Sequence, residues 1–194
     1  MSGLKRADLL SLEEYAKQRG DFRSKVMAHK KNRKVHLGEN ATLYFEDRLT
    51  MQYQIQEMLR IERIFEQEGI QDELDAYNPL IPEGSNLKAT FMLEFPDVEE
   101  RKAALSQLLG IEYKVWIQVN GFDKVYPEAN EDLERTTEEK TSSVHFLRFE
   151  FTPQMVQAAK QGAALAMGIE HDNYSYTLDP VPYNIRQSLV ADFD

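Results

Sequence analysis

Hydrophobic and polar residues alternate with two periods along the chain, and these periods predict both strands and helices. Alternation every second residue predicts strands or hairpins over residues 33–46, 87–95, 114–126, 142–151, 163–170 and 174–178. The first hairpin is expected to turn at 38–40, and the second at Asn120-Gly121. Asn-Gly between two alternating segments is a strong signal for a tight turn.

Helix-capping residues predict where the helices begin and end. Residues 11–14 (SLEE) have capping-box spacing, and Gly20 is expected to divide the N-terminal helical segment, residues 1–31. A long central helix is predicted near residues 50–68, with Thr50 as its cap and Gly69 as its stop. Shorter helices are predicted over residues 70–77, 97–109 and 153–161 and from about 183 to 191.

The strands and helices follow one another without a regular β-α-β order, an internal repeat or a linker. This order predicts a single α+β domain over residues 1–194, with a mostly antiparallel sheet packed against several helices. The acidic segment PEANEDLERTTEEK (127–140) is expected to be a mobile, solvated loop. The apolar segment YNPLIP (77–82) is expected to fold back over the core.

One acidic residue interrupts the apolar side of the long central helix. At about 100° per residue, Glu62 falls among the apolar side chains of Met51, Ile55, Met58, Leu59 and Phe65. The opposite side of this helix is also apolar, which is typical of a helix packed between other elements. We therefore expect Glu62 to be buried. A buried carboxylate must be protonated, paired with a cation or bound to a metal.

Two residues of the strand over 142–151 are candidate partners for this carboxylate. His145 and Arg148 lie on opposite faces of the strand, so at most one of them is expected to pair with Glu62. Together with Glu57, which lies on the flank of the helix, they form a candidate polar centre. A structural ion pair is preferred to a catalytic role, because structural pairs also perturb pKa values. An ordinary surface network also accounts for Glu57.

A metal site is the second interpretation of the same residues. Glu57, Glu62 and His145 would supply carboxylate and imidazole ligands, which suit iron or manganese. The four histidines are scattered and form none of the familiar zinc or di-iron spacings. The chain has no cysteine, so any cysteine-ligated cluster would belong to a partner.

Charge and composition exclude several other classes of function. The net charge of −10 argues against a broad surface for nucleic acid or anionic membrane, and the short basic run KKNRK (30–34) is interpreted as a solvated helix end. No segment has the apolar length of a signal peptide or a membrane span, and we expect a cytoplasmic protein. Motifs for nucleotide binding or a nucleophile elbow are absent.

Several separated stretches resemble one bacterial family, the domain of unknown function 3501. They are LLSLEEYAKQR, RKVHLGENATLYFE, YQIQEMLRIERIF, YNPLIP, LKATFMLE and TEEKTSSVHFLRFEFTP, and they cover nearly the whole chain. The family has no established activity and supplies no catalytic residues. The resemblance implies a setting beside rubrerythrin-like proteins and iron–sulfur oxidoreductases, and therefore a link to iron, peroxide or redox metabolism.

Three hypotheses for function follow. The first is a non-catalytic accessory protein that docks onto a redox partner, with the YNPLIP loop and the acidic loop as contact regions and an exposed apolar patch. The second is a metal- or small-ligand-binding protein, either a binding protein or an enzyme, built around Glu57, Glu62, His145 and Arg148. The third is a hydrolase or transferase that uses a carboxylate and His145. The first is preferred.

Overall fold

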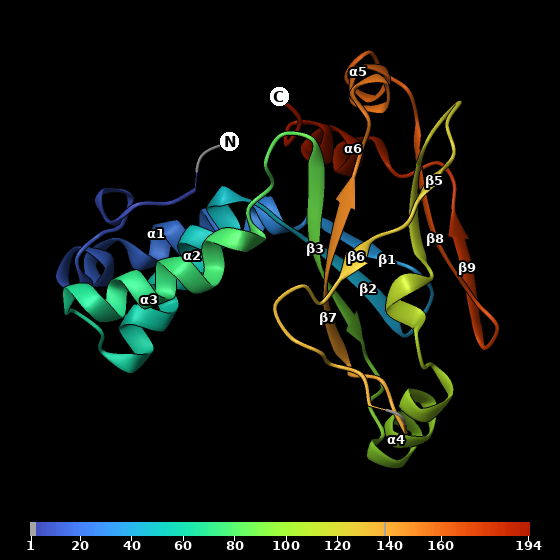
Figure 1. The fold of residues 1–194 in the computed structure, drawn as a ribbon. Helices are drawn as coiled ribbons and strands as arrows, with labels where there is room; N and C mark the ends of the chain where they lie inside the picture. The colour runs from blue at the N-terminus through green and yellow to red at the C-terminus, as the bar shows by residue number, and fades with distance from the viewer. Residues whose placement is uncertain (1–2, 138) are drawn as a thin grey trace.

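Two antiparallel sheets form the body of the protein in the computed structural model, which describes residues 3–137 and 139–194 (Figure 1). The five-stranded sheet has the order β1 (Lys34–His36), β2 (Ala41–Glu46), β3 (Asn86–Leu93), β7 (Val144–Glu150) and β6 (Glu128–Ala129). The four-stranded sheet has the order β5 (Lys124–Val125), β4 (Val115–Val119), β8 (Leu165–His171) and β9 (Tyr174–Leu178). The predicted α+β fold is therefore confirmed, with two sheets.

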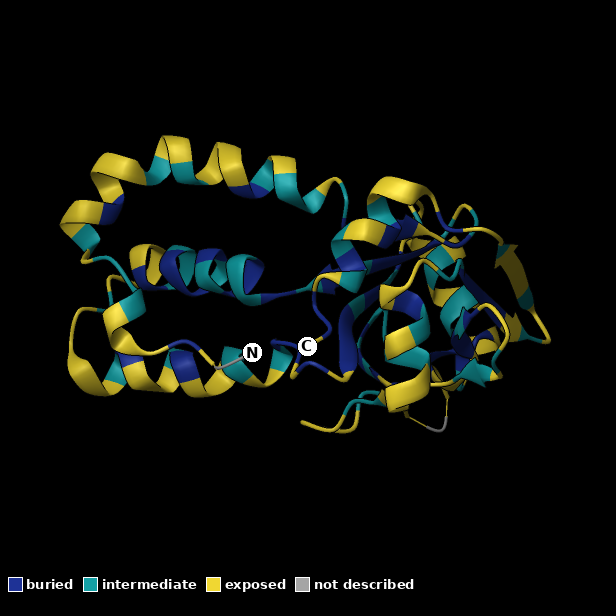
Figure 2. Cartoon of the chain, turned by 90° about the horizontal axis from the view of Figure 1, so that it is seen from above, coloured by how far each residue is buried: buried dark blue, intermediate teal, exposed yellow. Residues whose placement is uncertain are grey.

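Three helices project to one side of the sheets and are called the helical arm: α1 (Leu12–Lys30), α2 (Arg48–Glu62) and α3 (Gln67–Tyr77). Helix α2 packs against both α1 and α3 (Figure 2). The remaining helices are α4 (Val98–Gln107), α5 (Pro153–Lys160) and α6 (Tyr183–Val190), with short 3-10 turns η1 (Arg6–Asp8), η2 (Asn78–Leu80) and η3 (Ile111–Tyr113). Within the described ranges, no helix has the length and apolar character to cross a bilayer.

The hydrophobic residues form two separate cores. The larger core takes side chains from both sheets, including Leu43, Phe91, Ile117, Phe149 and Met167. The smaller core lies within the arm and is formed by Leu4, Met51, Ile55, Leu59, Ile70, Leu74 and Ile81. Figure 2 shows these buried positions along α2 and on the strands of the body.

Strand register decides which polar residues enter the body and which remain outside. His145 lies opposite Phe91 across the β3–β7 pair, and both are fully buried. Arg148 lies opposite Lys88. Because opposed residues point to the same face and successive residues alternate, Arg148 and Lys88 lie on the outer face of the five-stranded sheet.

Two helices, α1 and α2, differ in extent from the sequence-based prediction. Gly20 does not interrupt α1, because its position is exposed, and glycine in an exposed helix costs only about 1 kcal/mol. The predicted helix near 50–68 begins earlier, at Arg48, since the Asp47 carboxylate accepts a hydrogen bond from the Thr50 N–H at 2.9 Å. It ends at Glu62, because Arg63 adopts a left-handed conformation with φ of 56°.

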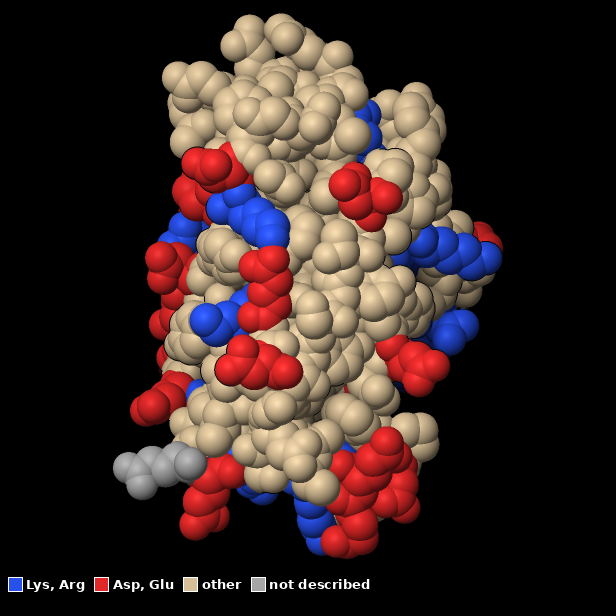
Figure 3. Space-filling view, turned by 90° about the vertical axis from the view of Figure 1, so that its right-hand side faces the viewer, with Lys and Arg blue, Asp and Glu red and all other residues tan. Residues whose placement is uncertain are grey.

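The side of the molecule that carries the four-stranded sheet is largely uncharged, with small groups of basic and acidic side chains (Figure 3). On this sheet, Lys124 lies 4.3 Å from the centre of the Trp116 ring and pairs with Glu170. Trp116 is buried. A Cβ atom at Gly168 would approach the Trp116 ring to 2.5 Å, so this position needs glycine.

Candidate functional site

Glu62 is exposed, and the expectation that it is buried is wrong. The apolar residues beside it are also exposed, with Ile61 at 62% and Phe65 at 70%. The reason is the left-handed turn at Arg63, which ends the helix before another element can cover this side. Glu62 is therefore not obliged to have a partner, and it does not anchor a polar centre.

Glu57 belongs to an ion-pair network inside the helical arm. Its carboxylate accepts hydrogen bonds from Arg19 Nε at 2.7 Å, from Arg19 Nη2 at 3.0 Å and from the hydroxyl of Tyr15 at 2.7 Å. Hydrogen bonding from Arg19 is the main reason that the pKa of Glu57 falls to about 2. The network joins α1 to α2, which agrees with the structural interpretation of Glu57.

Arg148 is held on the outer face of the five-stranded sheet. Its Nε and Nη2 atoms donate to Glu131 at 2.9 and 2.8 Å, and its Nη1 atom donates to Glu150 at 3.0 Å. These hydrogen bonds, first those to Glu131, raise the pKa of Arg148 above its ordinary value. Arg148 therefore pairs with Glu150 of β7 and with Glu131 in the segment after β6, and no contact with Glu62 is found among the described residues.

The four residues of the predicted polar centre occupy separate surroundings. Glu57 lies inside the arm, Glu62 at its end, Arg148 outside the sheet and His145 within the body. Within residues 3–137 and 139–194, no three His, Asp or Glu side chains are arranged to hold a metal ion. The structure thus does not bring Glu57, Glu62 and His145 together.

His145 is fully buried, and its hydrogen bonds define its tautomer. Asn130 Oδ1 accepts from the Phe146 N–H at 3.2 Å, so Asn130 Nδ2 faces His145 Nδ1 at 2.9 Å and donates to it. His145 Nε2 lies 3.0 Å from the Ser142 carbonyl oxygen, which only accepts, so Nε2 carries the proton. Burial is the main cause that lowers the pKa of His145. The ring is neutral and both nitrogens are occupied.

Glu112 is a buried carboxylate beside His145. Only 1% of its surface is exposed, and its oxygens accept from the Thr136 hydroxyl at 2.6 Å and from the Thr141 hydroxyl at 3.4 Å. Its Oε2 atom lies 3.9 Å from His145 Nε2. Hydroxyl donors and a neutral imidazole compensate part of the cost of burying this carboxylate. We interpret this centre as structural, because both His145 and Glu112 are shielded from solvent.

The segment 127–140 includes a short strand that the sequence analysis did not predict. It contributes β6 and places Asn130 and Thr136 against the buried His145 and Glu112. Glu138, which belongs to the same predicted loop, lies outside the described residues. Sequence analysis missed Glu112, because the short IEY turn has no period that distinguishes a buried glutamate from an exposed one.

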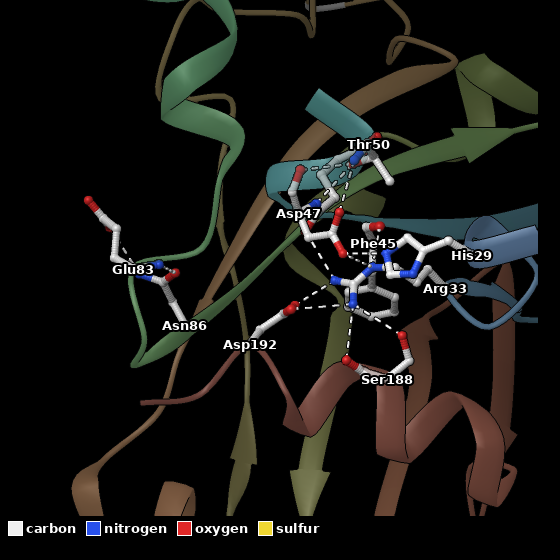
Figure 4. Close-up of polar contacts among 10 residues, drawn as sticks. His29, Arg33, Phe45, Asp47, Thr50, Glu83, Asn86, Ser188 and Asp192 are labelled. Atoms are coloured by element: carbon white, nitrogen blue, oxygen red, sulfur yellow. Dashed lines mark hydrogen bonds and ion pairs between the residues drawn. The ribbon is translucent and has the colours of Figure 1, made fainter. Parts of the chain in front are cut away.

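A second buried polar cluster joins the arm to the body (Figure 4). Arg33 is 2% exposed, and Figure 4 shows its guanidinium surrounded by acceptors from distant parts of the chain. Nε donates to the Phe45 carbonyl, Nη2 to the Glu46 carbonyl and Nη1 to the Ser188 carbonyl, each at 3.1 Å. Nη2 also lies 2.5 Å from Asp192 Oδ2.

Asp47 extends this cluster toward α1. Its Oδ2 atom lies 3.4 Å from Arg33 Nε and 2.5 Å from His29 Nε2, and its Oδ1 atom caps α2. Burial raises the pKa of Asp192 to about 6, although Arg33 opposes this shift. The cluster fixes the end of α1, the start of α2 and the C-terminal segment to one another, so we assign it a structural role.

The interpretation of KKNRK (30–34) as a solvated helix end is therefore wrong for Arg33. This arginine is covered by the C-terminal segment, which contains Ser188 and Asp192 and lies more than 150 residues later in the chain. Lys30 agrees better with the prediction, since it is only partly buried at the end of α1.

The free end of the arm carries an apolar surface. We call residues 60–73 the arm tip; Figure 1 shows the turn between α2 and α3 at the end of the arm that is remote from the sheets. A pocket of about 290 Å³ lies beside it. Its apolar lining is Leu9, Leu10, Leu12, Leu59, Ile64, Phe65 and Ile70, and Arg6 and Ser11 complete it.

Comparisons with known proteins agree with this fold and leave the activity open. A crystal structure of a novel protein of unknown function from Burkholderia pseudomallei K96243 is similar over 100% of both chains, with 49% sequence identity and a TM-score of 0.94. No match was found among the curated proteins. The model of the family described as "Protein of unknown function (DUF3501)" matches residues 3–193, and the chain therefore belongs to this family.

Proposed function

We propose that the protein is a cytoplasmic accessory protein that docks onto a partner protein through its arm tip. The observation that carries the proposal is the exposure of Phe65 (70%) and Ile61 (62%) at the end of the arm. Covering a large apolar side chain contributes roughly 1.5–3 kcal/mol. Exposed apolar groups gathered beside a pocket are typical of a protein-binding surface.

The pocket beside Phe65 supplies the shape for an apolar anchor. Its leucine and isoleucine lining comes from the N-terminal segment, from α2 and from α3, so three parts of the chain cooperate to form it. Binding energy in protein interfaces concentrates in a few side chains that fill such pockets. A partner is expected to insert one apolar side chain there and to cover Phe65.

Charge around the arm tip indicates the chemistry of the partner. The arm tip has a formal net charge of 2 − 5 = −3, because residues 60–73 contain two bases (Arg60 and Arg63) and five acids (Glu62, Glu66, Glu68, Asp72 and Glu73). Burial, with the charges of Glu62 and Asp72, raises the pKa of Glu73. A basic segment with an apolar anchor complements this surface, whereas a second copy of this chain would place acid against acid.

The family resemblance suggests which partners to test first. It implies a setting beside rubrerythrin-like proteins and iron–sulfur oxidoreductases, so the partner in this proposal is a redox protein that carries its own metal. A protein without cysteine cannot ligate an iron–sulfur cluster through thiolates. Its contribution would be to hold or orient the redox partner.

Biolayer interferometry with these two candidate partners from the same bacterium tests the proposal. The wild type is expected to bind at least one of them, and the double substitution Ile61→Ser/Phe65→Ser is expected to weaken binding by about tenfold or more. Tyr183→Ser is the matched control, because Tyr183 is 74% exposed on α6, away from the arm tip. Equal binding by the double variant, or no binding of either candidate, would refute the proposal.

A further inference from the structure

A cleft of about 450 Å³ separates the arm from the outer face of the five-stranded sheet. Tyr77, Pro79 and Leu80 line one side, and Phe146 lies on the sheet side. The sheet also supplies two cations, Lys88 and Arg148, which are neighbours across the β3–β7 pair. Three carboxylates, those of Asp75, Glu131 and Asp132, complete the charged part of the lining. A mostly apolar concavity of this size with a few polar groups is typical of a small-molecule site.

Lys88 is a buried cation at this cleft. The residue is 7% exposed, and its ammonium group donates to the Pro79 carbonyl at 2.7 Å. Glu83 is its nearest carboxylate, at 3.4 Å, and this glutamate is 67% exposed. An ammonium group has three donors, so Lys88 retains capacity for a further acceptor.

Arg148 already holds a carboxylate at the rim, and this carboxylate belongs to the protein itself. Glu131 lies on the exposed segment after β6 and accepts two hydrogen bonds from Arg148 in the fork geometry that suits carboxylates. Its side chain is 54% exposed, so it can leave the arginine without breaking a buried contact. Glu131 thus occupies the position that the carboxylate of a ligand would take.

We propose that this cleft binds a small amphipathic carboxylate, whose anionic group replaces Glu131 on Arg148 and whose apolar part lies between Phe146 and Leu80. The exchange of one carboxylate for another keeps the arginine paired. The favourable free energy of binding comes from covering the apolar walls of the cleft. Glu131 competes with the ligand and lowers its affinity, because this glutamate is always present at high local concentration. This inference does not depend on the arm tip or on the proposed partner.

Isothermal titration with decanoate tests the site. Glu131→Gln removes the competing charge and is expected to tighten decanoate binding by about threefold to tenfold, whereas Arg148→Gln is expected to weaken it by about tenfold or more. Glu128→Gln is the matched control, because Glu128 is exposed and lies opposite Arg148 on β6, whereas Arg148 donates its hydrogen bonds to Glu131 and Glu150. This control is expected to bind like the wild type.

Tighter decanoate binding by Glu131→Gln cannot be explained by misfolding, because a misfolded protein does not acquire a tighter site. Decylamine serves as a second probe with the same apolar chain and the opposite charge, and its binding is expected to show no such gain. Failure of Glu131→Gln to bind decanoate more tightly, or unchanged binding in Arg148→Gln, would overturn the proposal. Equal gains for decanoate and decylamine would also overturn it.

Discussion

Replacing Glu57 by glutamine measures the ion pair that joins α1 to α2. The substitution keeps the shape of the side chain and removes the charge that Arg19 and Tyr15 hold at 2.7 Å. The pKa of Glu57 falls from an ordinary 4.5 to about 2. A shift of this size corresponds to about 3 kcal/mol at neutral pH, and solvent screening at Arg19, which is 35% exposed, reduces our expectation to about 2 kcal/mol.

The sign of the pH dependence follows from the direction of the shift. A carboxyl whose pKa is lowered by folding stabilises the protein above its unfolded pKa, and this stabilisation is lost as the pH falls toward the folded pKa. For Glu57 the loss occurs as the pH falls from about 4.5 toward 2. The stability difference between wild type and Glu57→Gln is therefore expected to be full at neutral pH and to shrink in acid.

Urea denaturation followed by far-ultraviolet circular dichroism gives this difference at each pH. Glu62→Gln is the matched control, since Glu62 is an exposed residue at the end of the same helix, and we expect it to change stability by less than about 0.5 kcal/mol. A difference for Glu57→Gln that stays constant from neutral to acid pH would contradict the linkage. A difference as small as that of the control would show that the pair contributes nothing.

Two further substitutions test the remaining contacts. Arg33→Met removes the buried guanidinium beside Asp192 and is expected to destabilise the protein by about 3–5 kcal/mol in urea denaturation. Arg23→Met, at an exposed position in α1, serves as its control. Equal denaturation midpoints for the two variants would refute the stabilising role of the buried polar cluster around Arg33. Gly168→Ala places a Cβ 2.5 Å from both the Trp116 ring and the Tyr176 carbonyl oxygen, and it is expected to lower stability by about 1–3 kcal/mol in thermal melts. An unchanged melting temperature would contradict the requirement for glycine at this position.

The sequence predicted local features of the fold well, because their causes lie within a few residues. The alternation in 142–151 predicted β7, and the helix predicted over 153–161 is α5. The Thr152 hydroxyl caps this helix by accepting from the Met155 N–H at 3.3 Å. The β4–β5 hairpin at Asn120-Gly121 was also correct.

The burial of polar residues was harder to predict, because it depends on distant segments. Glu62 fits the apolar side of an ideal helix, and only the turn at Arg63, a residue with no glycine-like signal, exposes it. Arg33 lies in a basic run, and its partner Asp192 is 159 residues away along the chain. No helical or strand period contains such information, so the polar clusters could be found only in the folded chain.

The two hydrophobic cores share no residue, and this division affects how stability should be understood in this protein. Loss of apolar area in the arm leaves the interior of the body unchanged, so the two parts need not have the same free energy of opening. A single melting temperature would then describe the unfolding of the less stable part. The cluster around Arg33 joins the arm to the body, so it decides how far the unfolding of one part destabilises the other.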